Sequence, residues 1–98
     1  MEEKIYLAEL FEIYGDLLTD RQKEVFKMHY LLDFSLSEIA EELSVTRQNA
    51  SDTLKNAKDK LSSLEKALKI REKEEKLREL SKDAGAETSA KILEIIGR

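Results

Sequence analysis

Two helix-start signals lie close together in residues 34–54, FSLSEIAEELSVTRQNASDTL, and they constrain the fold more than any other feature. Ser35 and Glu38 have the spacing of a capping box, in which each side chain accepts a hydrogen bond from the other residue's backbone N–H. Thr46 is a second N-cap candidate. Each predicted helix has its own apolar stripe at helical spacing: Ile39, Ala40 and Leu43 in the first, and Ala50, Leu54 and Ala57 in the second. Two capped helices joined by so short a connection predict a helix-turn-helix.

The composition favours helix along the whole chain. The 98 residues include no proline and three glycines, and Ala, Leu, Glu, Lys and Arg are abundant. These five residue types are the strong helix formers. We therefore predict an all-α fold, a helix-turn-helix bundle followed by a long C-terminal helix and a short final helix. The expected division is a helix-turn-helix domain at residues 1–68 and a helical extension at residues 69–98 that serves dimerisation or partner contact.

Apolar faces predict the remaining helices at residues 3–15, 20–32, 46–80 and 87–96. Gly15 is expected to end the first of them in the left-handed conformation that often follows a helix. Thr19 and Gln22 form a second capping box at the start of the next helix. The segment 46–80 reads as one long helix or as two nearly continuous ones.

An apolar seam alternates four and three residues apart along the first half of that long segment, through Ala50, Leu54, Ala57, Leu61, Leu64 and Leu68. Such a period of 3.5 residues is typical of helices that pack lengthwise on neighbours. We expect the seam to pack on the N-terminal helices. The final helix carries Ile92, Leu93, Ile95 and Ile96, which need a partner in the same chain or in a second chain. The seam and these residues together predict a homodimer.

The net charge of −4 is unevenly distributed along the chain. Residues 1–45 have a net charge of −7, residues 46–82 of +4 and residues 83–98 of −1. The basic excess therefore begins where the second helix of the motif begins. This placement suits a DNA reader, because contacts with phosphate supply much of the affinity. A solvated helix face of mixed charge is the alternative interpretation, since seven acidic residues share the basic segment.

In a helix-turn-helix the second helix enters the major groove, and its N-terminal residues meet the base edges. Arg47 is suited to guanine or phosphate, and Gln48 is suited to adenine. Asp52 is a counter-signal, because a carboxylate near DNA is costly unless it pairs with a cation or a cytosine amine. The predicted DNA-binding residues are Thr46, Arg47, Gln48, Ser51, Asp52, Lys55 and Lys58.

Catalytic chemistry is not predicted. His29 is the single histidine and lies on an apolar helix face, so we interpret it as a packed residue and expect no catalytic residue. There is no cysteine and no glycine-rich phosphate loop, and we expect no metal site and no cofactor. The acidic N-terminus lacks a signal-peptide pattern, and no apolar stretch approaches the length of a membrane span. A cytoplasmic protein without enzymatic activity and without membrane insertion is expected.

The segments LTDRQKEV at 18–25 and SLSEIAEELSVTRQ at 35–48 resemble the fourth region of bacterial sigma factors. That region has the pattern L-T-x-R-Q-x-x-V, a gap, and then S-x-x-E-I-A-x-x-L-x-V-S/T. An early helix precedes the L-T-x-R-Q segment and a long charged helix follows T-R-Q. With these two features, the chain resembles the YlxM family of small Gram-positive bacterial proteins over about residues 5–80. The resemblance implies a helix-turn-helix regulator. Genes of this family commonly neighbour the gene of the signal-recognition-particle GTPase, which implies a link to that pathway.

Three departures from the family pattern concern the motif itself. Ser44 stands where the turn usually has glycine, so the turn must form with a less permissive residue. Ala50 replaces a Val or Ile that normally wedges between the two helices, which leaves a smaller contact. Asn49 and Ser51 stand where the family tends to have Ala and Tyr. The last departure bears on the base-contact face more than on the fold.

Two functions follow from these observations. The first is a DNA-binding regulatory protein whose long and final helices form a homodimer. The second is a protein-interaction module, in which the helix-turn-helix docks a protein partner such as a component of the signal recognition particle. An RNA target is a third possibility, although the sequence lacks the aromatic stacking surface of single-strand readers.

Overall fold

The computed structural model describes residues 3–97, and these residues form six α-helices and no strand, which confirms the all-α prediction. The chain divides into two compact units, Met1–Ala67 and Leu68–Arg98. Unit 1 contains α1 (Glu3–Tyr14), α2 (Asp20–Phe26), α3 (Leu36–Leu43) and nearly all of α4 (Arg47–Leu68). Unit 2 contains α5 (Ile70–Lys82) and α6 (Ala86–Ile96).

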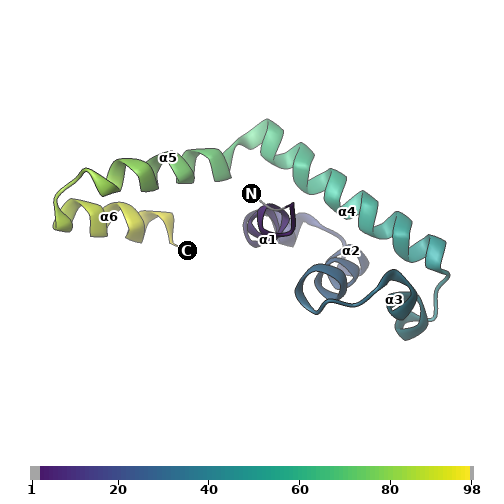
Figure 1. Ribbon diagram of the computed structural model, residues 1–98. Helices are drawn as coiled ribbons and strands as arrows, with labels where there is room; N and C mark the ends of the chain where they lie inside the picture. The colour runs from purple at the N-terminus through teal and green to yellow at the C-terminus, as the bar shows by residue number, and fades with distance from the viewer. Residues whose placement is uncertain (1–2, 98) are drawn as a thin grey trace. The chain divides into compact units, whose positions relative to one another are not determined.

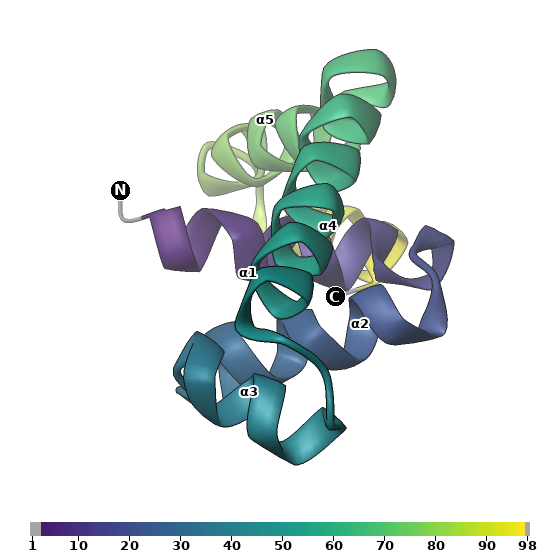
Figure 2. The ribbon, with the colours of Figure 1, turned by 90° about the vertical axis from the view of Figure 1, so that its right-hand side faces the viewer.

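The core of unit 1 forms where α4 passes α3, α2 and α1 in turn (Figures 1 and 2). The rings of Phe11 and Phe26 stack in parallel with their centroids 4.6 Å apart. The apolar side chains that are fully buried come from all four helices: Leu10, Phe26, Ile39, Ala50, Ala57 and Leu61. The predicted seam therefore packs on the N-terminal helices, as expected. The seam residues from Ala50 to Leu61 are buried within unit 1, so they are not available to pack against a second chain.

Both predicted capping boxes are present. The Thr19 hydroxyl accepts from the Gln22 backbone N–H at 3.2 Å, and the Gln22 side chain accepts from the Thr19 N–H at 2.9 Å. Ser35 and Glu38 repeat this exchange at 3.1 and 2.9 Å. Each box satisfies two backbone donors that a helix start would otherwise leave without partners, and so it fixes where α2 and α3 begin.

The helix predicted at 20–32 changes its winding within its second half. After α2 the chain continues as a π-helical segment, Lys27–Leu31. It closes with a hydrogen bond from the Leu32 N–H to the Lys27 carbonyl at 3.0 Å, the five-residue spacing of a π turn. Asp33 follows with a φ of 60°, in the left-handed region, and turns the chain toward α3.

The expectation that Gly15 ends the first helix in a left-handed conformation is wrong. Gly15 begins a short 3-10 helix, Gly15–Leu17, and its φ is not positive. Its lack of a side chain matters for packing, because a Cβ there would lie 3.2 Å from the ring of Phe11. The Phe11 ring therefore leaves little room for a side chain at position 15, and the backbone turn does not need a glycine there.

The long helical segment is two helices, which is the second of the two predicted forms. Lys69 separates α4 from α5 and has a φ of 54°. An L-residue adopts this left-handed conformation at a cost, so the interruption is a real end of α4 and not a bend within it. In unit 2, α5 and α6 pack against each other as an antiparallel hairpin (Figure 1).

Candidate nucleic-acid interface

The turn of the helix-turn-helix is built around Ser44. This residue caps α3 in the left-handed conformation, with φ 56° and ψ 42°. The backbone then closes through a hydrogen bond from the Val45 N–H to the Ala40 carbonyl at 3.0 Å. Position 44 is therefore the place where glycine would be conformationally free, and here serine adopts the same geometry. The expectation that the turn forms with a less permissive residue is confirmed.

Thr46 starts the second helix of the motif. Its hydroxyl accepts from the Asn49 backbone N–H at 2.9 Å, and its carbonyl accepts from the Ala50 N–H at 3.0 Å. The hydroxyl of this predicted DNA-binding residue is thus engaged as the helix cap. The cap still leaves amides of the first turn of α4 without acceptors inside the helix. An anion at this position would complement them.

Ala50 anchors the first turn of α4 and is fully buried. It lies against a core to which α3 contributes Ile39 and Ala40, both of them buried. Leu54 and Ala57 continue the buried face one and two turns further along. The outward side chains of α4 are therefore held at a defined orientation by three buried residues along the helix, Ala50, Leu54 and Ala57.

Arg47 and Gln48 are exposed on the first turn of α4. Among the described residues the Arg47 side chain has no hydrogen-bond or ion-pair partner. Gln48 donates from its side-chain amide to the Asp52 carboxylate at 2.8 Å, one helical turn away. Asp52 thereby gains a polar partner within the helix, and Gln48 has to release it before it can read a base. Ser51 is half-buried beside them.

Both lysines among the predicted DNA-binding residues are paired in the structure. Lys55 is exposed and forms a salt bridge with Asp59 at 2.9 Å. Lys58 is half-buried, forms a salt bridge with Glu3 of α1 at 2.9 Å and lies 5.9 Å from the centre of the Tyr30 ring. The hydrogen bond with Glu3 raises the pKa of Lys58 above its ordinary value of 10.5. Lys58 therefore connects α4 to α1, whereas Lys55 belongs to the solvent-facing side of α4.

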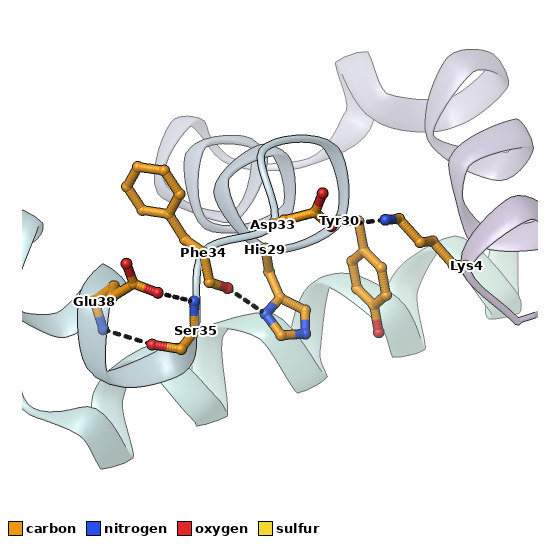
Figure 3. A pocket seen from close by; sticks show the side chains of 7 residues that line it. All are labelled: Lys4, His29, Tyr30, Asp33, Phe34, Ser35 and Glu38. Atoms are coloured by element: carbon orange, nitrogen blue, oxygen red, sulfur yellow. Dashed lines mark hydrogen bonds and ion pairs between the residues drawn. The ribbon is translucent and has the colours of Figure 1, made fainter.

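The connector between α2 and α3 positions the motif (Figure 3). The His29 ring approaches the Phe34 carbonyl with its Nδ1 atom at 2.9 Å, which favours the tautomer that donates from Nδ1. Asp33 accepts from Lys4 at 2.7 Å, and this hydrogen bond lowers the pKa of Asp33 below its ordinary value. Together with Ser35 and Glu38 these residues line a shallow pocket of about 350 Å³. The structure therefore assigns His29 to holding the connector, consistent with its interpretation as a packed residue.

Sequence reasoning missed the contacts that α1 makes with the motif. Lys4 and Glu3 lie in the first turn of α1 and reach Asp33 and Lys58, which are far away in the sequence. The sequence offered one signal for the turn at Asp33, since Asp tolerates the left-handed conformation better than most residues, but that signal does not indicate a contact with Lys4. Nothing local to either pair indicates its partner.

No metal or membrane feature is found in the described part of the chain. No group of three or more His, Cys, Asp or Glu side chains lies close enough to hold a metal ion within residues 3–97. None of the helices in that range is long and apolar enough to cross a membrane.

A short helix, a turn through a left-handed residue and a longer helix anchored by a buried alanine define a helix-turn-helix protein. Comparison with known sequences agrees with this class. Residues 1–95 match the family described as "Putative helix-turn-helix protein, YlxM / p13 like", also designated UPF0122, and the chain belongs to that family.

Curated relatives share a shorter segment with the chain. The UPF0122 protein of Thermoanaerobacter sp. (strain X514) is 47% identical over 47 residues, which cover 48% of this chain and 40% of the relative. That of Clostridium kluyveri is 52% identical over 48 residues, 49% of this chain and 43% of the relative. That of Clostridium acetobutylicum is 50% identical over 48 residues, 49% and 41% respectively. The matched segments thus span less than half the length of these relatives.

Proposed function

We propose that the chain binds duplex DNA in a regulatory role, through the first two turns of α4. The observation that carries this proposal is Arg47, an exposed cation without a partner among the described residues, on the first turn of the second helix of the motif. The buried Ala50 holds that turn rigidly. Base-reading side chains work from this position in helix-turn-helix proteins.

Each predicted residue has a distinct part in this proposal. Arg47 grips phosphate or guanine, and Gln48 exchanges its hydrogen bond with Asp52 for one with a base edge. Lys55 exchanges Asp59 for a phosphate, at a modest cost because the pair is exposed to solvent. Thr46 and Ser51 border this surface, and Lys58 holds α4 on α1 beside it. The protein acts here as a cytoplasmic binding protein without enzymatic activity or cofactor.

The test is a titration of labelled duplex DNA, followed by fluorescence anisotropy at about 50 and about 200 mM salt. A DNA reader loses affinity steeply between these salt concentrations, because binding releases counterions from the phosphates. We expect Arg47→Ala to weaken binding by about tenfold or more. Arg21→Ala is the matched control, since it removes the same charge from the exposed side of α2, outside the motif. An absence of binding at low salt contradicts the proposal.

Docking of a protein partner is the second candidate, and charge favours it. Unit 1 has nine Lys and Arg against fourteen Asp and Glu, a net charge of −5. The outer side of α3 exposes Glu38, Glu41 and Glu42. A basic partner would be attracted to this surface, whereas DNA would be repelled. Given the family, a component of the signal recognition particle is the partner that we would test first.

Charge reversal on α3 separates the two candidates. In the double variant Glu41→Lys and Glu42→Lys, docking of a basic protein surface weakens and DNA binding strengthens, because both changes act through the same local potential. Purified components of the signal recognition particle, protein and RNA separately, are the probes, alongside duplex DNA. A double variant that loses DNA affinity counts against the DNA proposal, and one that keeps its affinity for the protein component counts against docking through α3.

A further inference from the structure

Unit 2 has almost no apolar core of its own. Among its described residues, Ile96 is the one buried apolar side chain, and the other buried residues are Glu74 and Ser81. Two short helices that bury so little apolar surface do not outweigh the conformational entropy lost when they become ordered. The hairpin of α5 and α6 therefore requires a further surface to pack against.

The hairpin presents an apolar face that fits this requirement. Residues advance by 100° around a helix, so on α5 both Leu77 and Leu80 lie on one flank of the inward-facing Ser81. On α6, Ile92 and Ile95 are rotated from the inward-facing Ile96 in the same sense as Leu77 and Leu80 are from Ser81. Because the two helices are antiparallel (Figure 1), these flanks are on the same side of the hairpin. Leu80 is 64% exposed and Ile95 82%, although both are large apolar residues.

The charges of unit 2 indicate which partner covers this face. The unit has eight Lys and Arg against seven Asp and Glu, a net charge of +1. Cations on both helices form salt bridges within the helix, as Lys76 does with Glu72 at 3.4 Å on α5 and Lys91 with Glu87 at 3.4 Å on α6. A partner surface that carries charges of one sign only, such as a phosphate-rich one, would be attracted only weakly to such a balanced pattern. A second copy of the same hairpin, turned by a twofold axis, presents charges of both signs to both signs and apolar residues to apolar residues.

We propose that the α5–α6 hairpin is a homodimerisation element, in which two copies pack their Leu77, Leu80, Ile92 and Ile95 faces together as a four-helix bundle. Antiparallel helix pairs with one apolar face each are the usual components of such bundles. The α4 seam offers little for this purpose, because its residues from Ala50 to Leu61 are buried in unit 1. The inference goes beyond DNA binding and stands whether or not the motif contacts DNA.

The test is the molar mass of the full chain by light scattering at about 10 and about 100 μM, a range in which dimers of moderate affinity form. The wild type is expected to be a dimer at the higher concentration. Leu80→Ala and Ile95→Ala each trim the face and are expected to weaken the dimer about tenfold, since each removes a large apolar side chain from the interface. Alanine is the strongest helix former, so these variants keep the helices intact. Leu80→Lys and Ile95→Lys are expected to abolish the dimer.

Leu93→Lys is the matched control. Leu93 is 46% exposed and lies on the opposite flank of α6, so a lysine there leaves the proposed face unchanged. A wild type that is monomeric at about 100 μM overturns the proposal. A dimer that survives Leu80→Lys and Ile95→Lys overturns it too, as does one that Leu93→Lys disrupts as strongly as they do.

Discussion

The two units of the chain have similar helix-forming sequences but very different interiors. In unit 1, side chains from α1, α2, α3 and α4 converge on fully buried residues such as Phe26 and Leu61. In unit 2, a hairpin of comparable helical quality leaves Leu80 and Ile95 in solvent. Helix propensity therefore does not distinguish a folded core from an association element. The difference is whether the apolar faces of neighbouring helices pack against one another within the unit.

Two of the three non-glycine residues with a left-handed conformation, Ser44 and Lys69, show the same contrast. Ser44 joins α3 to α4, and both of these helices have residues buried in the core of unit 1. Lys69 joins α4 to α5 at the boundary between the units. Tertiary packing offsets the backbone strain at Ser44, whereas Lys69 has no such support within one unit.

The largest expected effect on stability is seen when a leucine-to-alanine substitution in the core of unit 1 is compared with the same substitution in unit 2. Leu61→Ala leaves a cavity in the core of unit 1 and is expected to lower its free energy of unfolding by about 2–5 kcal/mol. Leu80→Ala is expected to change the free energy of unfolding of unit 1 by less than about 0.5 kcal/mol, because Leu80 lies in unit 2 and is 64% exposed. Urea denaturation followed by tyrosine fluorescence measures unit 1 selectively, because Tyr6, Tyr14 and Tyr30 all lie in it. Equal losses of unfolding free energy in the two variants would contradict the difference between the interiors of the two units.

The next effect concerns a buried polar contact between α1 and α4. The Tyr14 hydroxyl donates to the Glu65 carboxylate at 2.7 Å, and both side chains are buried. Tyr14→Phe removes the donor and is expected to cost about 1–3 kcal/mol, the penalty for weakening the solvation of a buried polar group. Glu65→Gln keeps an acceptor oxygen and is expected to cost less. Circular dichroism at increasing urea concentration measures both, and a neutral Tyr14→Phe contradicts the expectation.

A gain in stability is expected at the turn. Ser44→Gly relieves the left-handed strain and is expected to raise the free energy of unfolding of unit 1 by about 0.5–1 kcal/mol, after the greater freedom of glycine in the unfolded chain is counted. Lys69→Gly, the matched change at the unit boundary, is expected to leave the tyrosine-detected transition in place. A destabilising Ser44→Gly would show that the serine side chain supports the turn in another way.

The smallest effect is a pH dependence at the start of α3. Hydrogen bonding to the Ser35 backbone, and then to its side chain, lowers the pKa of Glu38 below its ordinary value of 4.5. The stability that ionised Glu38 adds is therefore fully present above that value and is lost as the pH falls through the lowered pKa of the folded state. Glu38→Gln keeps the capping box without the charge, so its unfolding midpoint should fall less than that of the wild type between about pH 6 and about pH 3. Identical pH profiles would contradict this assignment.

Sequence reasoning succeeded where the determinants of structure are local. The capping boxes at Thr19 and Ser35 and the gap between the helices predicted at 46–80 and 87–96 depend on residues within one or two turns. It failed at Gly15, because a glycine at a helix end usually marks a left-handed turn, whereas here its φ is not positive and the ring of Phe11 lies close to it. The choice of a π-helical ending for α2 likewise depends on packing that no local pattern records.

The candidate site was predictable only in part, for the same reason. The position of Arg47 and Gln48 on the first turn of α4 follows from the cap at Thr46 and from helical spacing. The pairing of Lys58 with Glu3 joins residues that only the folded chain brings together. Long-range ion pairs of this kind decide which cations remain available to a ligand, and a sequence pattern does not contain them.

Amide hydrogen exchange at two chain concentrations tests the difference between the units most directly. Amides in the buried part of α4, around Leu54 to Leu61, are expected to exchange slowly and at the same rate at both concentrations, because their protection reflects the core of unit 1. Amides of α5 and α6 are expected to exchange quickly in the dilute sample and to gain protection as the concentration rises, because association stabilises the hairpin by mass action. A hairpin that is as well protected as α4 at every concentration would contradict the account.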